Sequence, residues 1–566
     1  MLSIGGNMAK IVSRECRFVY HRPASAYNKD THIVKELLHY SDGTKKKNLR
    51  LIENFKRPFW TTKEHYRNHK QKKESEDTDK LLEGKATQSD LGRAIAVKLG
   101  SMYNGVKDLY SIKSSPYVYG IDVNSRTYIK YLYQKQYPDV STPYEVCVLD
   151  IEVDTIKNEL VIISIAMNDK IHTIITKDYL KQKFTTKDNT DAIQKDVTEK
   201  LEYLYGKYVP KTDLSQSIKR SYSVVDDDLT AVLETMSKLH VWNPDIVAVW
   251  NINYDMEYIL DILDKNHIDP KEVMCDPDLP KELRYFKFTP GRDKTAKGGG
   301  INPEERWPIV DCPANFYWID AMCAHRYIRV GGKAMSGGYS LDNILNHELG
   351  SDFKKLKFKD DAEGISKVSI EWHQHMVANK PLEYITYNQW DVMSILELDS
   401  KTKDLHTVMP MLAGLSNFDV FNSGPKRIVD ALHFYYLEND RVLSVKDPKA
   451  GDDKLLGLSN WIVLLPSCRI SERGGDILKG GGVDTNIRMF VADSDQVSGY
   501  PSNTQAANVS IDTTAKELKS IDGIGIDTFR EQNINMLFGK INSLDYGTEM
   551  FNLPTMYEIA KLIEKK

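Results

Sequence analysis

Residues 144–154, YEVCVLDIEVD, decide the fold of this chain. Their apolar and polar side chains alternate as in a β-strand, so the even-numbered side chains share one face and the odd-numbered ones the other. Asp150 and Glu152 therefore project side by side from an otherwise apolar strand. Burial without a partner would be costly for both carboxylates, and together they can share a divalent cation such as Mg²⁺ or Mn²⁺. The alternative is a strand that ends at the surface with two solvated acids.

The pattern that follows predicts a mixed sheet. Strands at residues 160–166 and 171–176, with turns at 157–159 and 168–169, continue the first strand as an antiparallel meander. A helix at 229–239, capped from residues 226–228, then leads to a continuous apolar strand at 246–250 of the kind found in parallel sheets. We therefore predict an α/β (α+β multidomain) protein whose central sheet has a ribonuclease-H-like layout.

Two further stretches carry acids at positions where a ligand could bind. In residues 250–255, WNINYD, Asp255 opens a helix just past the carboxyl end of a strand, where ligands gather in open α/β sheets. In the helix predicted at 381–400, Tyr387 and Asp391 are four residues apart and share one face. The alternatives are an aspartate that only caps its helix and a Tyr–Asp pair that only lies at the surface.

Together the three sites, DxE at 150–152, NxxxD at 251–255 and YxxxD at 387–391, resemble the exonuclease motifs of DEDD-type 3′→5′ exonucleases with tyrosine, as found in proofreading family B DNA polymerases. Residues 338–350, GYSLDNILNHELG, resemble the segment of that family that leads towards the third motif. The resemblance implies two Mg²⁺ ions, for which Mn²⁺ can substitute, with Tyr387 positioning the attacking water and Asn251 contacting substrate. Four residues would be the metal ligands: Asp150, Glu152, Asp255 and Asp391.

Residues 488–510 resemble polymerase motif A, the DxxSLYPS element of the family B palm. The resemblance makes Asp495 a catalytic metal ligand and lets Ser498 and Gly499 offer backbone N–H groups to the phosphates of a bound nucleotide. Tyr500 would close off the 2′ position of the incoming sugar. Gly499 stands where the family usually has leucine, which removes a packing side chain but keeps the N–H group.

The expected remainder of a polymerase is missing. Residues 540–547, KINSLDYG, echo the fingers motif with the wrong spacing, and no second palm aspartate follows. The resemblance therefore implies the N-terminal part of a split family B polymerase, as some tailed bacteriophages encode. Its partners would be primer–template DNA, single-stranded 3′ ends, dNTPs, replisome proteins such as a sliding clamp, and a second polypeptide with the fingers, second palm aspartate and thumb. The alternative is a stand-alone 3′→5′ exonuclease whose vestigial palm serves as a DNA- or protein-binding scaffold.

The chain has 566 residues and a net charge of −4, so its overall charge does not itself predict a nucleic-acid partner. Its six scattered cysteines argue against structural zinc and a disulfide framework, and fit the cytoplasm of a host cell. No apolar run predicts a membrane span or a secretory signal. We expect an N-terminal domain (1–140), the exonuclease domain (141–405), a helical connection that packs back on the N-terminal domain (406–470) and a partial palm (471–566).

Two expectations concern the N-terminal domain, which the sequence predicts to mix short strands with loops. Residues 55–63, FKRPFWTTK, place aromatics among cations, which favours either base stacking or core anchoring. Residues 70–85 are strongly charged and are expected to form a helix or a mobile loop.

Overall fold

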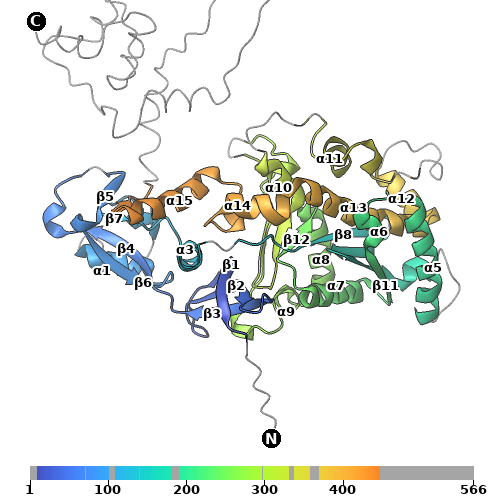
Figure 1. Cartoon of the computed structure of the whole chain (residues 1–566), viewed down its shortest axis with the longest axis horizontal. Helices are drawn as coiled ribbons and strands as arrows, with labels where there is room; N and C mark the ends of the chain where they lie inside the picture. The colour runs from blue at the N-terminus through green and yellow to red at the C-terminus, as the bar shows by residue number, and fades with distance from the viewer. Residues whose placement is uncertain are drawn as a thin grey trace, which may run out of the picture. The chain divides into compact units, whose positions relative to one another are not determined.

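A computed structural model of the chain (Figure 1) describes residues 9–70, 72–100, 109–138, 141–181, 190–295, 298–329, 335, 337–356, 358 and 369–446. The chain divides into two compact units after residue 456, and all described residues belong to the first. Asp495, Ser498, Gly499 and Tyr500 lie outside the described residues.

A mixed sheet of six strands is the centre of the described part, in the order β11-β10-β9-β8-β12-β15. Strands β8, β9 and β10 form the predicted antiparallel meander, β12 lies parallel to β8, and β15 lies parallel to β12. The α/β prediction is confirmed at this level. The bounds in chain order are β8 Val146–Asp154, β9 Glu159–Met167, β10 Lys170–Thr176, β11 Lys219–Val225, β12 Ile246–Val249 and β15 Tyr317–Asp320.

Helices cover both faces of this sheet (Figure 1). Val146 and Val148 of β8 pack in one core with Trp390 of α13 (Pro381–Thr402). Cys147 and Leu149 face the opposite core, which includes apolar residues of α7 (Asp228–Trp242) and α8 (Ile252–Lys265). The alternation predicted for residues 144–154 is therefore confirmed, and the acids lie on the α13 side.

Local signals set the boundaries of these elements. Asn158 and Asn168 take left-handed backbone conformations, with φ of 56° and 51°, in the turns on either side of β9. Asp227 caps α7 by accepting a hydrogen bond of 2.7 Å from the backbone N–H of Thr230. Both features follow from short polar side chains that tolerate or stabilise non-helical backbone.

The N-terminal region contains small sheets. Strands β1 (Ile11–Arg22), β2 (Thr31–Tyr40) and β3 (Lys45–Glu53) form an antiparallel sheet, and its strands are longer than the short ones expected. Helix α3 (Ser125–Gln136) packs against β1, whereas α1 (Leu91–Leu99) packs against Phe59 in a further small sheet.

The prediction for residues 70–85 is wrong. This segment contains β5 (Ser75–Asp77) and the first residues of β6 (Leu81–Ala86). β5 pairs with β16 (Arg441–Leu443), and β6 pairs with β4 (Arg57–Thr62). The partner of β5 is more than 350 residues away in the chain, so local charge density carried no sign of the pairing.

The aromatics of residues 55–63 are core anchors. Phe59 and Trp60 of β4 are buried, and the buried guanidinium of Arg57 donates to the backbone oxygens of Gly120 and Val123. Because they are buried, Phe59 and Trp60 are not available for base stacking.

Helix α15 (Gly424–Glu438) contacts the N-terminal region through aromatic side chains. The ring of Phe434 stacks on that of Tyr131 of α3 with centroids 4.1 Å apart. His433 lies against Tyr128 of the same helix, and the two side chains are hydrogen-bonded. Residues 424–438 thus share a core with residues more than 290 positions earlier in the chain.

No helix in the described ranges has the length and apolar character required to cross a bilayer.

Candidate active site

The four predicted carboxylates come from three elements and meet beside β8. Asp150 and Glu152 extend from β8 and Asp391 from α13, and each offers an oxygen within 4.8 Å of those of the other two. Asp255, in the first turn of α8, accepts a hydrogen bond of 3.3 Å from the backbone N–H of Ile151. Asp255 therefore lies next to the strand segment that carries the first two acids.

This cluster is poorly hydrated and strongly repulsive. Glu152, Asp255 and Asp391 are 7%, 4% and 3% exposed. Burial and the charges of its three acidic neighbours raise the pKa of Asp150 well above its ordinary value. Burial also raises the pKa of Asp255, against the opposing hydrogen bond from Ile151. Without a cation, the cluster favours taking up protons.

A lysine that the motif analysis did not identify lies at the centre of this site. The Nζ of Lys355 donates to Oδ2 of Asp391 at 2.6 Å and to the hydroxyl oxygen of Tyr387 at 2.8 Å. Burial opposes its charge, but Asp391, Tyr387 and Asp150 together raise the pKa of Lys355 well above its ordinary value. The site thus holds one permanent cation against four carboxylates.

The loop that carries Lys355 is held from both sides. The backbone N–H of Lys355 donates to Oδ1 of Asp342 at 2.9 Å, and the indole N–H of Trp390 donates to the backbone oxygen of Lys354 at 3.1 Å. Asp342 lies in α11 (Leu341–Glu348), within the SLD segment noted in the sequence. That segment therefore contributes to the site through the backbone of a neighbouring loop.

Helix α13 supplies more than the predicted Tyr387 and Asp391. Asn388 donates from Nδ2 to Oδ2 of Asp150 at 2.7 Å, and the hydroxyl of Tyr384 donates to Oε2 of Glu152. His373 of α12 (Ile370–Asn379) lies 2.7 Å from the Tyr384 hydroxyl. The spacing of residues 384, 387, 388 and 391 places them on one helix face, and this is the signal by which the sequence could have revealed them.

The donor set fits hard divalent cations. Its ligands are carboxylate oxygens, the type that Mg²⁺ and Mn²⁺ prefer. The buried Oδ1 of Asp391 has no hydrogen-bond partner within the described ranges, although Oδ2 of the same side chain is bound by Lys355. A metal ligand needs a free acceptor atom, and Oδ1 of Asp391 is one. Asp150, Glu152 and Asp391 can therefore hold a cation here.

Asn251 occupies a special backbone position. It precedes α8 in a left-handed conformation with φ of 69°, and its side chain does not cap the helix. Asp320 provides that function, because its Oδ2 accepts the N–H of Ile252 at 2.9 Å. This leaves the Asn251 side chain without a capping role, one helical turn before Asp255.

The aromatics near these elements differ in exposure. Tyr254 is 45% exposed and meets the ring of Tyr258 edge to face, whereas Phe316 is fully buried. Of these three rings, those of Tyr254 and the partly exposed Tyr258 are accessible to a base, whereas Phe316 belongs to the core.

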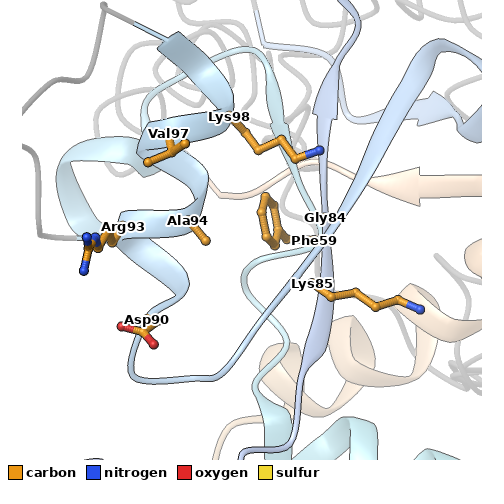
Figure 2. Close-up of a pocket in the computed structure, with 8 residues that line it drawn as sticks. All are labelled: Phe59, Gly84, Lys85, Asp90, Arg93, Ala94, Val97 and Lys98. Atoms are coloured by element: carbon orange, nitrogen blue, oxygen red, sulfur yellow. The ribbon is translucent and has the colours of Figure 1, made fainter.

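A separate hollow of about 360 Å³ lies in the N-terminal region (Figure 2). Its lining includes Phe59 and Gly84, together with the basic side chains Lys85, Arg93 and Lys98 and the acid Asp90. None of the predicted catalytic residues in the described ranges lines it. The hollow is thus distinct from the carboxylate cluster.

The chain matches no known protein-family model, and no significant match is found among curated proteins.

Proposed function

We propose that this chain is a metal-dependent 3′→5′ DNA exonuclease of the DEDD type with tyrosine, in which residues 141–405 form a ribonuclease-H-like domain. The observation that carries this proposal is the meeting of Asp150, Glu152 and Asp391 within 4.8 Å, with Lys355 joining Asp391 to Tyr387. The DxE strand and the YxxxD helix are far apart in the chain, and their acids converge on one side of the sheet.

Two Mg²⁺ ions are the proposed cofactors, held by the carboxylates of Asp150, Glu152, Asp255 and Asp391. When bound, two such ions activate a water and stabilise the leaving 3′ oxygen of an in-line displacement. The repulsion among the four acids supports this assignment, because divalent cations offset the same charges that raise the pKa values of Asp150 and Asp255.

Tyr387 would orient the attacking water. Burial and the charge of Asp391 raise the pKa of its hydroxyl well above the ordinary value, so the phenol stays protonated. A protonated phenol donates or accepts hydrogen bonds but does not remove a proton as a general base at neutral pH. Its role is therefore to position the water.

Lys355 would stabilise negative charge on the scissile phosphate. Its pKa is raised, so it remains an ammonium group, and it keeps Oδ2 of Asp391 and the Tyr387 hydroxyl in place. A fixed cation at the position where charge develops lowers the barrier more than a solvated one, because it needs no reorganisation during the reaction.

The wider proposal is that the chain is the N-terminal part of a split family B DNA polymerase acting in DNA replication. Asp495, Ser498, Gly499 and Tyr500 would supply half of a nucleotide-binding palm, and a second polypeptide would supply the rest. This part rests on the sequence motif alone. Proofreading fits it, because a frayed 3′ end could stack a base on the exposed Tyr254 near the carboxylates.

The test is a primer assay with the purified full chain, Mg²⁺ and a labelled primer–template that carries a 3′ mismatch, with and without dNTPs. The inactive variant is the double substitution Asp150→Ala, Glu152→Ala. The matched control is Glu159→Ala, Glu199→Ala, which removes two exposed acids of the same domain.

We expect degradation from the 3′ end that is lost in the inactive variant, retained in the control, and not replaced by extension when dNTPs are added. Extension by the chain alone would contradict the split polymerase. No degradation by the wild-type chain would contradict the exonuclease.

A further inference from the structure

A second group of metal-ligating side chains lies in the N-terminal sheet, apart from the carboxylate cluster. His21 near the end of β1 and His32 near the start of β2 are directly opposite each other in the antiparallel ladder. Their rings stack with centroids 4.6 Å apart. Asp30 precedes β2 by one residue, and each of the three offers a ligand atom within 4.8 Å of those of the other two.

Two facing atoms of this triad have no hydrogen bonds. Oδ1 of Asp30 and Nδ1 of His32 are buried and without hydrogen-bond partners within the described ranges. Asp30 is 1% exposed and His32 is fully buried. Such groups are normally satisfied, because each unpaired buried polar atom costs stability. Two unpaired atoms that face each other, beside the contact between His21 and Asp30, point to a cation that both could bind.

The second ring nitrogen of His32 and the second carboxylate oxygen of Asp30 are, in contrast, well bound. Nε2 of His32 lies 2.6 Å from Oγ of Ser125, the first residue of α3. Oδ2 of Asp30 accepts from the backbone N–H and the hydroxyl of Ser89 at 2.9 and 2.5 Å. In metal sites, hydrogen bonds of this kind orient each ligand and leave its inner atom free for the ion.

The distances agree with a small cation. Nε2 of His21 lies 3.2 Å from Oδ2 of Asp30, and Nδ1 of His32 lies 3.8 Å from Oδ1 of Asp30. Ligands around a tetrahedral zinc ion are about 3.3 Å apart, from bond lengths of about 2.0–2.1 Å.

We propose that His21, Asp30 and His32 form a metal site that binds one Zn²⁺ ion through three protein ligands, with a water as the fourth ligand. Two imidazoles and a carboxylate are a ligand set that zinc accepts. The cysteine spacing argues against structural zinc, but it says nothing about a site that contains no cysteine. The ion would fasten β1 and β2 to the segment around Ser89 and to the start of α3.

The test uses the full chain with Asp150→Ala and Glu152→Ala, so that the proposed exonuclease site does not contribute metal. Zinc content is measured by mass spectrometry after dialysis, and Co²⁺ is added to the metal-free protein to detect tetrahedral d–d absorption. His21→Gln removes one ligand from a side chain that is only partly buried. His39→Gln is the matched control, because His39 also faces a carboxylate, Glu15 at 3.7 Å, but lacks a third ligand.

We expect one zinc ion per chain and a Co²⁺ spectrum, both lost in His21→Gln and retained in His39→Gln. Added Zn²⁺ should raise the unfolding temperature of the background protein but not that of His21→Gln. Ser125→Ala, which removes an outer hydrogen bond, should weaken zinc affinity by about 10- to 100-fold.

The proposal would be overturned if the background protein held no more zinc than a folded His21→Gln variant and showed no Co²⁺ absorption. The triad would then be only an ion pair. Circular dichroism establishes that each variant is folded before the comparison. Equal zinc loss in His39→Gln would also overturn it, because the effect would then not be specific to the triad.

Discussion

The Nζ atom of Lys355 lies 2.6 Å from Oδ2 of Asp391 in the candidate active site. The pair is only partly shielded from water on the lysine side, whose side chain is 21% exposed, while that of Asp391 is 4% exposed. It therefore joins a solvent-accessible cation to a buried acid of the metal-binding cluster. Lys355 can therefore present its positive charge to a phosphate while its hydrogen bond keeps the carboxylate of Asp391 oriented.

Replacement of Lys355 by methionine should reduce exonuclease activity by about 100-fold, because removal of one preorganised electrostatic partner costs about that much. The methionine side chain keeps most of the volume but not the charge. Single-turnover degradation of a labelled single strand measures the effect. Lys354→Met is the control, since the Lys354 side chain is exposed and only its backbone oxygen is used. Equal rates for the two variants would remove Lys355 from the mechanism.

Tyr387→Phe should lower the rate of hydrolysis by about 100-fold while changing the free energy of unfolding by no more than about 1 kcal/mol. The ring is 1% exposed and phenylalanine fills the same space, so only the hydroxyl is lost. Rates at saturating Mg²⁺ and urea unfolding give the two quantities. A large loss of stability with an unchanged rate would indicate a purely structural tyrosine.

Tyr384→Phe should behave differently, although the two rings are stacked with centroids 5.9 Å apart. Its hydroxyl binds Glu152. We expect the variant to need more Mg²⁺ for half-maximal activity and to recover most of the rate at saturation. A rate loss that Mg²⁺ does not relieve would contradict this division of roles.

Asn388→Ala should raise the Mg²⁺ concentration for half-maximal activity by about 10- to 100-fold, since Asn388 orients Asp150 through a hydrogen bond of 2.7 Å. Gln389→Ala is the matched control. Gln389 is an equally buried amide on the same helix, but its Nε2 donates to Oγ1 of Thr173. If both variants shift the Mg²⁺ dependence equally, general loosening of α13 rather than orientation of Asp150 is the cause.

The stability of the metal-free protein should fall as pH rises above about 4, the ordinary pKa of an aspartate, and Mg²⁺ should remove this fall. The pKa values of Asp150 and Asp255 are raised in the folded state, so their contribution is fully present below the unfolded pKa and is lost as pH rises through the folded pKa. A cation at 100 times its dissociation constant adds about 2.7 kcal/mol. Thermal unfolding with and without Mg²⁺ measures both effects.

Asp150→Asn serves as the comparison for this pH dependence. It removes one of the repelling charges, so the metal-free variant should be more stable than the wild-type chain at pH values above the raised pKa of Asp150, and the two should converge at lower pH. A variant that is less stable than the wild type at the higher pH would show that the acids do not repel each other as described.

Periodicity in the sequence was enough to show which side chains of an element share a face. Strand periodicity placed Asp150 and Glu152 together, and helical periodicity placed Tyr387 and Asp391 together. The meander and its asparagine turns were likewise predictable, because they depend on neighbours in the chain. The α/β class follows from these local rules.

Which elements meet depends instead on the packing of the whole fold. Lys355 belongs to no periodic pattern, and only the packing of its loop between α11 and α13 brings it to Asp391. The pairing of β5 with β16 and the meeting of Ser89 and Ser125 with the His21–Asp30–His32 triad depend in the same way on segments distant in the chain. Local backbone geometry sets the period of side chains along one element, whereas contacts between elements depend on how all the buried surfaces pack at once. Lys355, Ser89 and Ser125 were for that reason visible only in the folded chain.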